Sequence, residues 1–320
     1  MTRLTRKLMI SILTVVLSIS ALGTTTFAWF TVTNVATVDQ FSANIVSDTG
    51  IEISLDGENW FSSITADMIN AVIPANFEFN HVTTADGETF RTLSGSTLGI
   101  TSTGYLSIPI YFRSQEVSTI TWTGVSLSGQ QKEWSADVSF YASNGDPITA
   151  GDSVFVDASN AIRVAIVDPV TVGASPVVYE KPANTGIYYN TVLGVSGTSL
   201  LQGSNPDPLV TNEGADGAMN YYYEKTNGTL PAETGTFATV ATITDLGAGV
   251  DVLALQATNT SGEFGFTDIL GSGLVTVDFN AAYGGVLFLN VWFEGFDAEA
   301  YNSLLTLAVN LGLTFEGYSN

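Results

Sequence analysis

The chain of 320 residues contains no cysteine and only one histidine, His81. Without cysteine it has no disulfide framework, no thiolate nucleophile and no zinc-ribbon or iron–sulfur site. One histidine cannot supply a metal site with several imidazole ligands. It lies in the segment NFEFNHVT, which has no HExxH metalloprotease motif, and the chain has no Gly-x-Ser-x-Gly nucleophile motif. We therefore expect His81 to be a surface or loop residue and the protein not to be an enzyme.

Basic residues are also few. The chain has 9 Lys+Arg against 31 Asp+Glu, which gives a formal net charge of −22. Such a chain repels a phosphate backbone, so no nucleic-acid partner is expected. Only 12% of the residues are charged and 45% are hydrophobic. This composition differs from that of a disordered acidic tail and provides material for a large core.

Three of the nine basic residues lie within residues 1–7. Residues 1–28 have the three regions of an export signal. Residues 1–7 are basic, residues 8–22 are apolar, and residues 23–28 end in small side chains suited to cleavage between Ala28 and Trp29. The apolar run is shorter than the roughly 20 residues that span a bilayer. We expect cleavage; the alternative is an uncleaved signal, which would be the only membrane contact of the protein.

Residues 29–320 are predicted to form an all-β domain. Short segments with alternating or β-branched residues are separated by clusters of Gly, Asn, Asp, Ser and Pro. The predicted strands are residues 41–46, 50–55, 105–112, 117–127, 134–141, 161–167, 237–243, 273–279, 286–293 and 303–315. Many short strands favour a β-sandwich or jelly-roll-like fold. Short helices are expected at residues 64–72, which Pro74 ends, and at 297–305.

The central part of the chain has the weakest strand pattern. Residues 170–235 are rich in Gly, Pro, Asn and Tyr. They are predicted to be a loop-rich insertion in the sandwich, and a separate small domain is the alternative.

Acidic turns are the candidate metal sites. The candidates are Asp56, Glu58, Asp86, Glu88, Asp146 and Asp152. Calcium accepts carboxylate and carbonyl oxygens from flexible loops, but no EF-hand-type loop is complete here. Asp-Gly pairs are common turn formers, so the turn interpretation is preferred over a Ca²⁺ site.

Tyrosines suggest a competing binding function. Tyr188 and Tyr189, and the run Tyr221-Tyr222-Tyr223, lie in the loop-rich middle of the chain. Side chains alternate across a strand, so such a run would expose some rings on one face. Exposed rings stack on sugars, and the alternative function is therefore a monomeric extracellular module that binds a glycan or another surface protein.

The junction GTTTFAWFTVT, residues 23–33, resembles the signal peptides cut by the SipW-type signal peptidase of Gram-positive bacteria. Substrates of that peptidase include the TasA/camelysin family of matrix-fibre proteins. The segments GIEISLDGENW and VWFEGFDAEAYN also resemble elements of surface proteins from Bacilli and Mollicutes relatives. The resemblance covers the two ends of the chain and not residues 128–260. It implies processing by a SipW-type peptidase and a secreted, cell-surface or extracellular-matrix protein that associates with itself or with other matrix proteins.

The segment after the predicted cleavage site is a candidate donor strand. Its apolar residues are Trp29, Phe30, Val32, Val35 and Val38, and it contains no proline. A free strand can add to an open sheet edge of a neighbouring subunit, and a head-to-tail contact that does not close produces a filament. The alternative is that residues 29–39 pair within their own sandwich. The expected function is therefore that of an exported structural protein, with filament assembly through the N-terminal strand.

Overall fold

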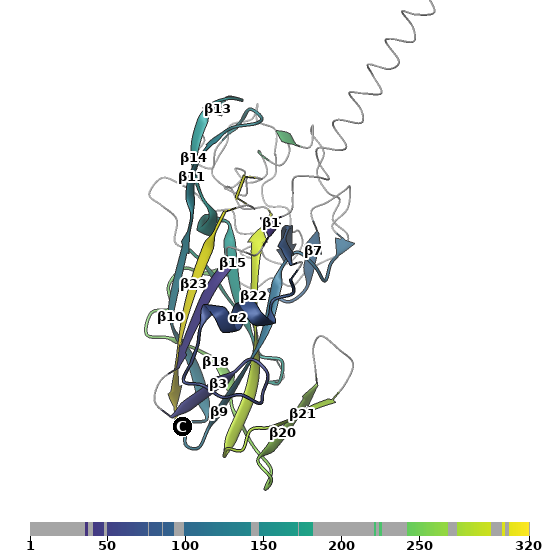
Figure 1. The fold of residues 1–320 in the computed structure, drawn as a ribbon, viewed down its shortest axis with the longest axis vertical. Helices are drawn as coiled ribbons and strands as arrows, with labels where there is room; N and C mark the ends of the chain where they lie inside the picture. The colour runs from purple at the N-terminus through teal and green to yellow at the C-terminus, as the bar shows by residue number, and fades with distance from the viewer. Residues whose placement is uncertain are drawn as a thin grey trace, which may run out of the picture. The chain divides into compact units, whose positions relative to one another are not determined.

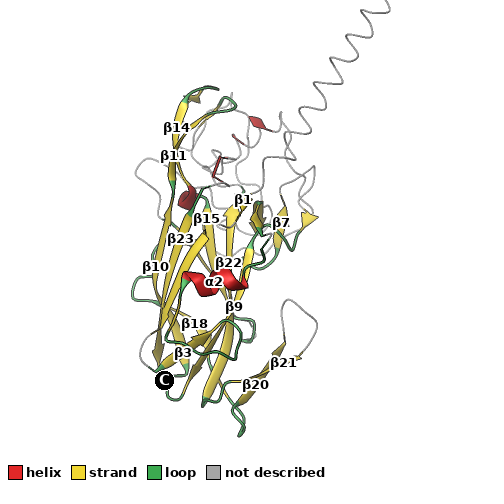
Figure 2. Cartoon of the chain, viewed as in Figure 1, coloured by secondary structure: helices red, strands yellow, loops and turns green. Residues whose placement is uncertain are grey.

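The computed structural model describes residues 36–37, 41–47, 50–75, 77–84, 86–92, 99–141, 147–171, 173–181, 221, 224–225, 242–267, 274–295, 303–304 and 307–319. All of them belong to the unit formed by residues 36–320. Strands dominate this part of the chain (Figure 2). The prediction of an all-β, sandwich-like protein is confirmed.

One sheet of the sandwich has five strands, and Figure 1 shows its long strands side by side. Their order is β18 (Val250–Ala254), β10 (Thr119–Gly129), β23 (Val309–Tyr318), β2 (Phe41–Ser47) and β4 (Ser63–Ile64). β10 and β23 pair antiparallel along almost their whole length, whereas β2 runs parallel to β23. Alternate residues of β23 are buried, because side chains of a strand point to opposite faces in turn.

The second sheet is built around β22 (Tyr283–Glu294), which has four partner strands. Along one edge, β22 pairs first with β9 (Leu106–Ser114) and then, near its end, with β6 (His81–Thr84). Along the other edge it pairs with β19 (Gln256–Ala257) and β15 (Ile162–Val167). Five further strands complete this sheet: β3 (Ile51–Ser54), β7 (Phe90–Thr92), β8 (Gly99–Ile100), β16 (Val177–Glu180) and β17 (Thr242–Ile243).

Aromatic side chains join the two sheets in the core. Phe112 of β9 and Phe315 of β23 are both fully buried, and their rings meet edge to face with centroids 5.3 Å apart. Trp122 of β10 contacts Tyr179 of β16 with centroids 6.0 Å apart. Such tilted contacts suit the charge distribution of aromatic rings. The interior between the two sheets is therefore one continuous apolar core.

The outer face of the second sheet is covered as well. A hairpin of β20 (Glu263–Thr267) and β21 (Leu274–Asp278) contributes Phe266, whose ring lies 6.3 Å from that of Tyr111. Every residue of β15 is buried, as are all residues of β22 after Tyr283. Burial on both faces requires a nearly continuous apolar run, which is what these two strands have in the sequence.

Most of the predicted elements appear, with shifts at their ends. The helix predicted at residues 64–72 is α2 (Ala66–Val72), which ends before Pro74. Proline disfavours helical geometry at the preceding residue, which explains the end of α2. The strand predicted at residues 134–141 is broken into β11 (Gln131–Ser135) and β12 (Phe140–Tyr141). Of the helix predicted at 297–305, only residues 303 and 304 are described.

Short elements fill the connections. β1 (Ala36–Thr37) pairs with β5 (Glu78–Phe79), β12 pairs with β13 (Pro147–Ile148), and β11 pairs with β14 (Ser153–Asp157). The short helix η2 (Ala158–Asn160) follows β14. β16 lies within the predicted insertion of residues 170–235 but belongs to the main sheet through its pairing with β15. Residues 182–220 and 226–241 lie outside the described part.

Candidate functional site

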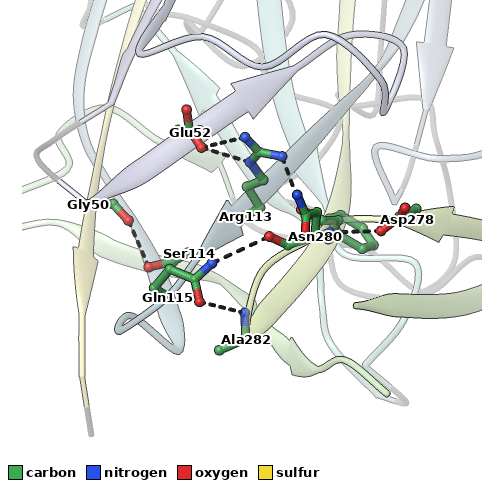
Figure 3. A network of polar contacts seen from close by, with 9 residues as sticks. Gly50, Glu52, Arg113, Ser114, Gln115, Asp278, Asn280 and Ala282 are labelled. Atoms are coloured by element: carbon green, nitrogen blue, oxygen red, sulfur yellow. Dashed lines mark hydrogen bonds and ion pairs between the residues drawn. The ribbon is translucent and has the colours of Figure 1, made fainter. Parts of the chain in front are cut away.

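A polar pocket of about 350 Å³ lies where β3, β9 and the turn between β21 and β22 meet. Near the end of β9, Arg113 faces Glu52 of β3 and the turn that carries Asn280, whereas Ser114 faces Gly50 (Figure 3). β3 and β9 are antiparallel neighbours with Glu52 opposite Arg113. Directly opposed residues point to the same face, so the register itself brings the two charges together.

Arg113 is engaged on three sides. Its Nε and Nη2 both lie 2.7 Å from Glu52 Oε2, and its Nη1 donates to the Phe279 carbonyl at 3.1 Å. The guanidinium carbon lies 4.5 Å from the centroid of the Trp60 ring, which is a cation–π contact. The Glu52 side chain is half exposed, so this ion pair adds little to stability. The bond from Arg113 to the Phe279 carbonyl connects the turn between β21 and β22 to the end of β9.

The other polar groups of the pocket are also paired. Ser114 Oγ donates to the Gly50 carbonyl at 2.7 Å and accepts from the Val117 N–H at 2.9 Å. Gln115 accepts from the Ala282 N–H at 3.2 Å. Asn280 has a positive φ of 46°, and its N–H donates to Asp278 Oδ1 at 2.9 Å. These bonds tie β3, β9 and the turn between β21 and β22 together at the pocket.

Two acidic turns repeat one hydrogen-bond pattern. In the first, Asp56 Oδ1 accepts from the N–H groups of Glu58 and Asn59, both at 2.8 Å, and from Ser54 Oγ. In the second, Asp86 Oδ1 accepts from the N–H groups of Glu88 and Thr89 at 2.9 and 2.6 Å, and from Thr84 Oγ1. These bonds satisfy the backbone of a tight turn. The two turns follow β3 and β6, so the same local device is used twice on the second sheet.

The surroundings of the acidic side chains in these two turns shift the pKa values of Asp56 and Glu88. Partial burial raises the pKa of Asp56, but the hydrogen bonds from Asn59, Glu58 and Ser54 outweigh it and hold that pKa well below its usual range. The pKa of Glu88 is raised by burial and by the nearby charge of Asp86. The oxygens of Asp56 and Asp86 that accept these bonds are therefore committed to their turns.

The remaining metal candidates do not join these turns. Asp152 accepts from the Thr149 N–H at 2.8 Å in the loop before β14, and Asp146 lies outside the described residues. Within the described ranges, no three acidic or histidine side chains gather as a metal site would require. The structure thus gives the described candidates turn geometry.

His81 differs from its prediction. It opens β6 with only 9% of its surface exposed, so the expectation of a surface or loop residue is wrong. Its Nε2 is buried without a hydrogen-bond partner among the described residues. The pairing of β9 with β22 ends at Val291, and β6 pairs with the next part of the same edge, where His81 lies opposite Phe293. A non-local strand pairing therefore buries the residue, and its own neighbours in sequence do not reveal this.

Acid is expected to destabilise the protein through His81. Burial lowers the pKa of this histidine from 6.5 to about 4, so the unfolded chain takes up the proton first as the pH falls. Above pH 6.5, the pKa of His81 in the unfolded chain, its protonation does not lower the free energy of unfolding. As the pH falls from 6.5 toward 4, that free energy decreases by on the order of 3 kcal/mol. Urea unfolding at pH 7 and pH 4.5, compared between the wild type and His81→Leu, measures the effect. Equal pH dependence in both proteins would contradict it.

The burial of Tyr221 argues against its predicted role as an exposed ring that stacks on a sugar. Tyr221 is only 5% exposed, and its ring packs against Trp134 and Phe140 with centroids 5.8 and 5.2 Å apart. Its hydroxyl donates to Asp137 at 3.3 Å. A ring in this position serves the core and cannot stack on a sugar. Tyr188, Tyr189, Tyr222 and Tyr223 lie outside the described residues.

The predicted cleavage and donor-strand residues also lie outside the described part: Ala28, Trp29, Phe30, Val32, Val35 and Val38. Of the predicted donor segment, only Ala36 and Thr37 are described. They form β1, opposite Phe79 and Glu78 of β5. The pairing involves two residues on each side and is separate from both main sheets.

One buried ion pair was not predicted. Arg163 of β15 lies 2.8 Å from Glu180 of β16, and their side chains are 1% and 8% exposed. Arg163 also donates to the carbonyls of Asn160 and Ile162. The signal in the sequence is a single charge inside the run AIRVAIV, because an unpaired charge there would be costly.

Beyond these sites, the described helices include none that is both long and apolar enough to cross a membrane. No family model, curated protein or solved structure matches the chain.

Proposed function

We propose that the protein is an exported structural component of the cell surface or extracellular matrix, and that its N-terminal segment joins subunits by strand addition. One observation carries this proposal. Among the described residues, both main sheets take all of their strands from Phe41 onward. Donation of residues 29–35 to a neighbouring copy would therefore remove no described strand from its own sandwich, which supports assembly by a donated strand.

The sandwich also offers a sheet edge of the kind that such a strand needs. β18 is the last strand of the five-stranded sheet on one side and pairs only with β10 among the described strands. An unpaired edge carries free N–H and C=O groups, and it is a template for another strand. A head-to-tail contact of this type does not close on itself, so it would extend as a filament.

The charge of the chain fits the same role. Removal of residues 1–28 would leave 6 basic residues against 31 acidic ones. Copies with this charge repel one another at low ionic strength and stay soluble. Screening by salt or divalent cations would weaken that repulsion at an interface. Assembly is therefore expected to depend on cations without requiring a specific metal site.

A comparison of two chain lengths tests the proposal. A chain that begins at Trp29 is expected to form filaments in negative-stain microscopy, whereas one that begins at Ala36 forms no filaments and keeps its melting temperature. The second chain retains β1, so its own pairing with β5 is preserved. The matched control carries Thr31→Ser and Thr33→Ser, which keep every apolar residue of the segment, and it should assemble. Filaments from the chain that begins at Ala36, or no filaments from the chain that begins at Trp29 at high concentration with divalent cations, would refute the proposal.

A further inference from the structure

β11 and β14 form a two-stranded ribbon that continues beyond the end of β10. The register pairs Gln131 with Asp157 and Ser135 with Ser153. The backbone bonds that flank it are Ala158 N–H to the Gln130 carbonyl and Ala136 N–H to the Asp152 carbonyl. In an antiparallel pair, hydrogen-bonded positions alternate with non-bonded ones. The bonded positions of β14 are therefore Val154 and Val156.

The other positions of β14 direct their backbone groups away from β11. Ser153, Phe155 and Asp157 thus place their N–H and C=O groups on the outer edge of the ribbon. β14 pairs with no second strand in the described part of the chain. The Phe155 side chain is 65% exposed, although phenylalanine is usually buried. Among the described strands, an unpaired edge and an exposed aromatic ring thus coincide at Phe155.

This edge lacks the features that protect the edges of natural sheets. Such edges are commonly short, or carry lysine, proline or a bulge. β8 and β4, for example, have only two residues each. β14 has five residues, SVFVD, with no lysine or proline, and its pairing with β11 is regular.

We propose that the outer edge of β14 pairs with β14 of a second copy of this chain, antiparallel and centred on Phe155. In this register Phe155 faces Phe155, and Ser153 faces Asp157 of the other copy. All outward-directed positions then become hydrogen-bonded pairs, since each of them is matched with another outward-directed position. A register shifted by one residue would place outward groups opposite inward ones and would lose these bonds.

Charge favours this occupant and this edge. The contact between the two β14 strands opposes no like charges, because its single acid, Asp157, meets Ser153 and is held by Lys181 of its own chain. The same symmetric contact through β11, QKEWS, would place Glu133 directly opposite Glu133. Like charges at opposed positions destabilise strand pairing. In a chain with net charge −22, an edge free of such repulsion is suited to self-association.

The contact is twofold symmetric and therefore closes as a dimer. It is independent of strand donation by residues 29–35 and goes beyond the proposed function. A contact limited to five residues a side is small, so the dimer is expected to be weak and concentration-dependent. Within an assembly of many copies, however, repeated weak contacts act together. There it would join neighbouring copies laterally.

Site-specific cross-linking tests the register, because the chain has no cysteine of its own. The purified chain with Phe155→Cys should form covalent dimers with a short bismaleimide, since the Cβ atoms of directly opposed residues lie roughly 5 Å apart. The matched control is Glu133→Cys, on the same face of the ribbon. In the proposed dimer the two copies of residue 133 are three strand spacings apart, about 14 Å, so it should not cross-link. Equal cross-linking of the two variants, or none of the Phe155→Cys variant at high concentration, would overturn the proposal.

A second pair of variants separates the backbone from the ring. Phe155→Pro removes an outward N–H and is compatible with an edge strand, so it should abolish the dimer in sedimentation while circular dichroism stays unchanged. Phe155→Thr keeps the N–H and should weaken the dimer without abolishing it. Cross-linking of Phe155→Cys should persist in a chain that begins at Ala36. Its loss there would show that the edge binds the N-terminal segment instead, and would overturn β14 pairing without affecting the proposed function.

Discussion

Replacement of Arg163 by leucine is expected to lower the free energy of unfolding by about 3–5 kcal/mol. The substitution leaves the Glu180 carboxylate, 8% exposed, without the guanidinium that lies 2.8 Å from it. A buried charge that loses its partner costs far more than the pair contributes, because water cannot reach it to replace the lost interaction. Urea unfolding at pH 7, followed by circular dichroism, measures the change.

The double variant Arg163→Leu/Glu180→Leu is the matched control. Removing both charges also removes the desolvation penalty, so the double variant is expected to be much more stable than Arg163→Leu alone. The double-mutant cycle then isolates the interaction of the pair. A double variant that is less stable than the single one would show that the two side chains act mainly through their other contacts, including the bonds from Arg163 to Asn160 and Ile162.

Replacement of Gly284 by alanine is expected to destabilise the protein by about 3 kcal/mol. A Cβ at this position would lie 2.4–2.6 Å from three atoms of the Phe279 ring, which itself is fully buried. The ring cannot move freely, because it also packs against Trp60 with centroids 5.7 Å apart. Its backbone carbonyl accepts the Arg113 bond, so the strain would extend to the polar pocket. Thermal and urea unfolding measure the loss.

Gly312→Ala provides the comparison for that variant. Gly312 also lies within a long strand, β23, but a Cβ there would be 3.4 Å from the nearest atom, Ser126 Cβ. Alanine fits at that distance and restricts the unfolded chain, so its effect should stay within about 1 kcal/mol. If both substitutions cost the same, the loss at Gly284 would come from the general properties of glycine in a strand rather than from the Phe279 ring.

The local pattern of residues was sufficient to predict most elements of the body. Alternation at residues 105–112 predicted β9, and the apolar run at 161–167 predicted β15. The helix before Pro74 was also predicted, since its pattern of residues and the proline that ends it lie within a short stretch of sequence. The break between β11 and β12 was missed, because one continuous alternating pattern does not reveal where the chain turns away from its partner.

The candidate sites divide in the same way. The two Asp-Gly-Glu turns are local, and the sequence identified both. The pocket at Arg113 was not predicted, because Glu52, Arg113 and Asn280 are distant in the chain and meet only through strand pairing. The sequence also gave no indication that β14 pairs with only one other described strand, because strand partners are chosen over long separations in the chain.

The sequence by itself determined the β class of the body, its acidic, cysteine-free chemistry and the prediction of an export signal. These properties depend on composition or on residues within a few positions of one another. Only the tertiary structure decided that His81 is buried beside β22, that Arg163 meets Glu180, and that β14 keeps an open edge in the described part of the chain. Those outcomes depend on which strands pair across long separations, and neither alternation nor spacing along the chain specifies that choice.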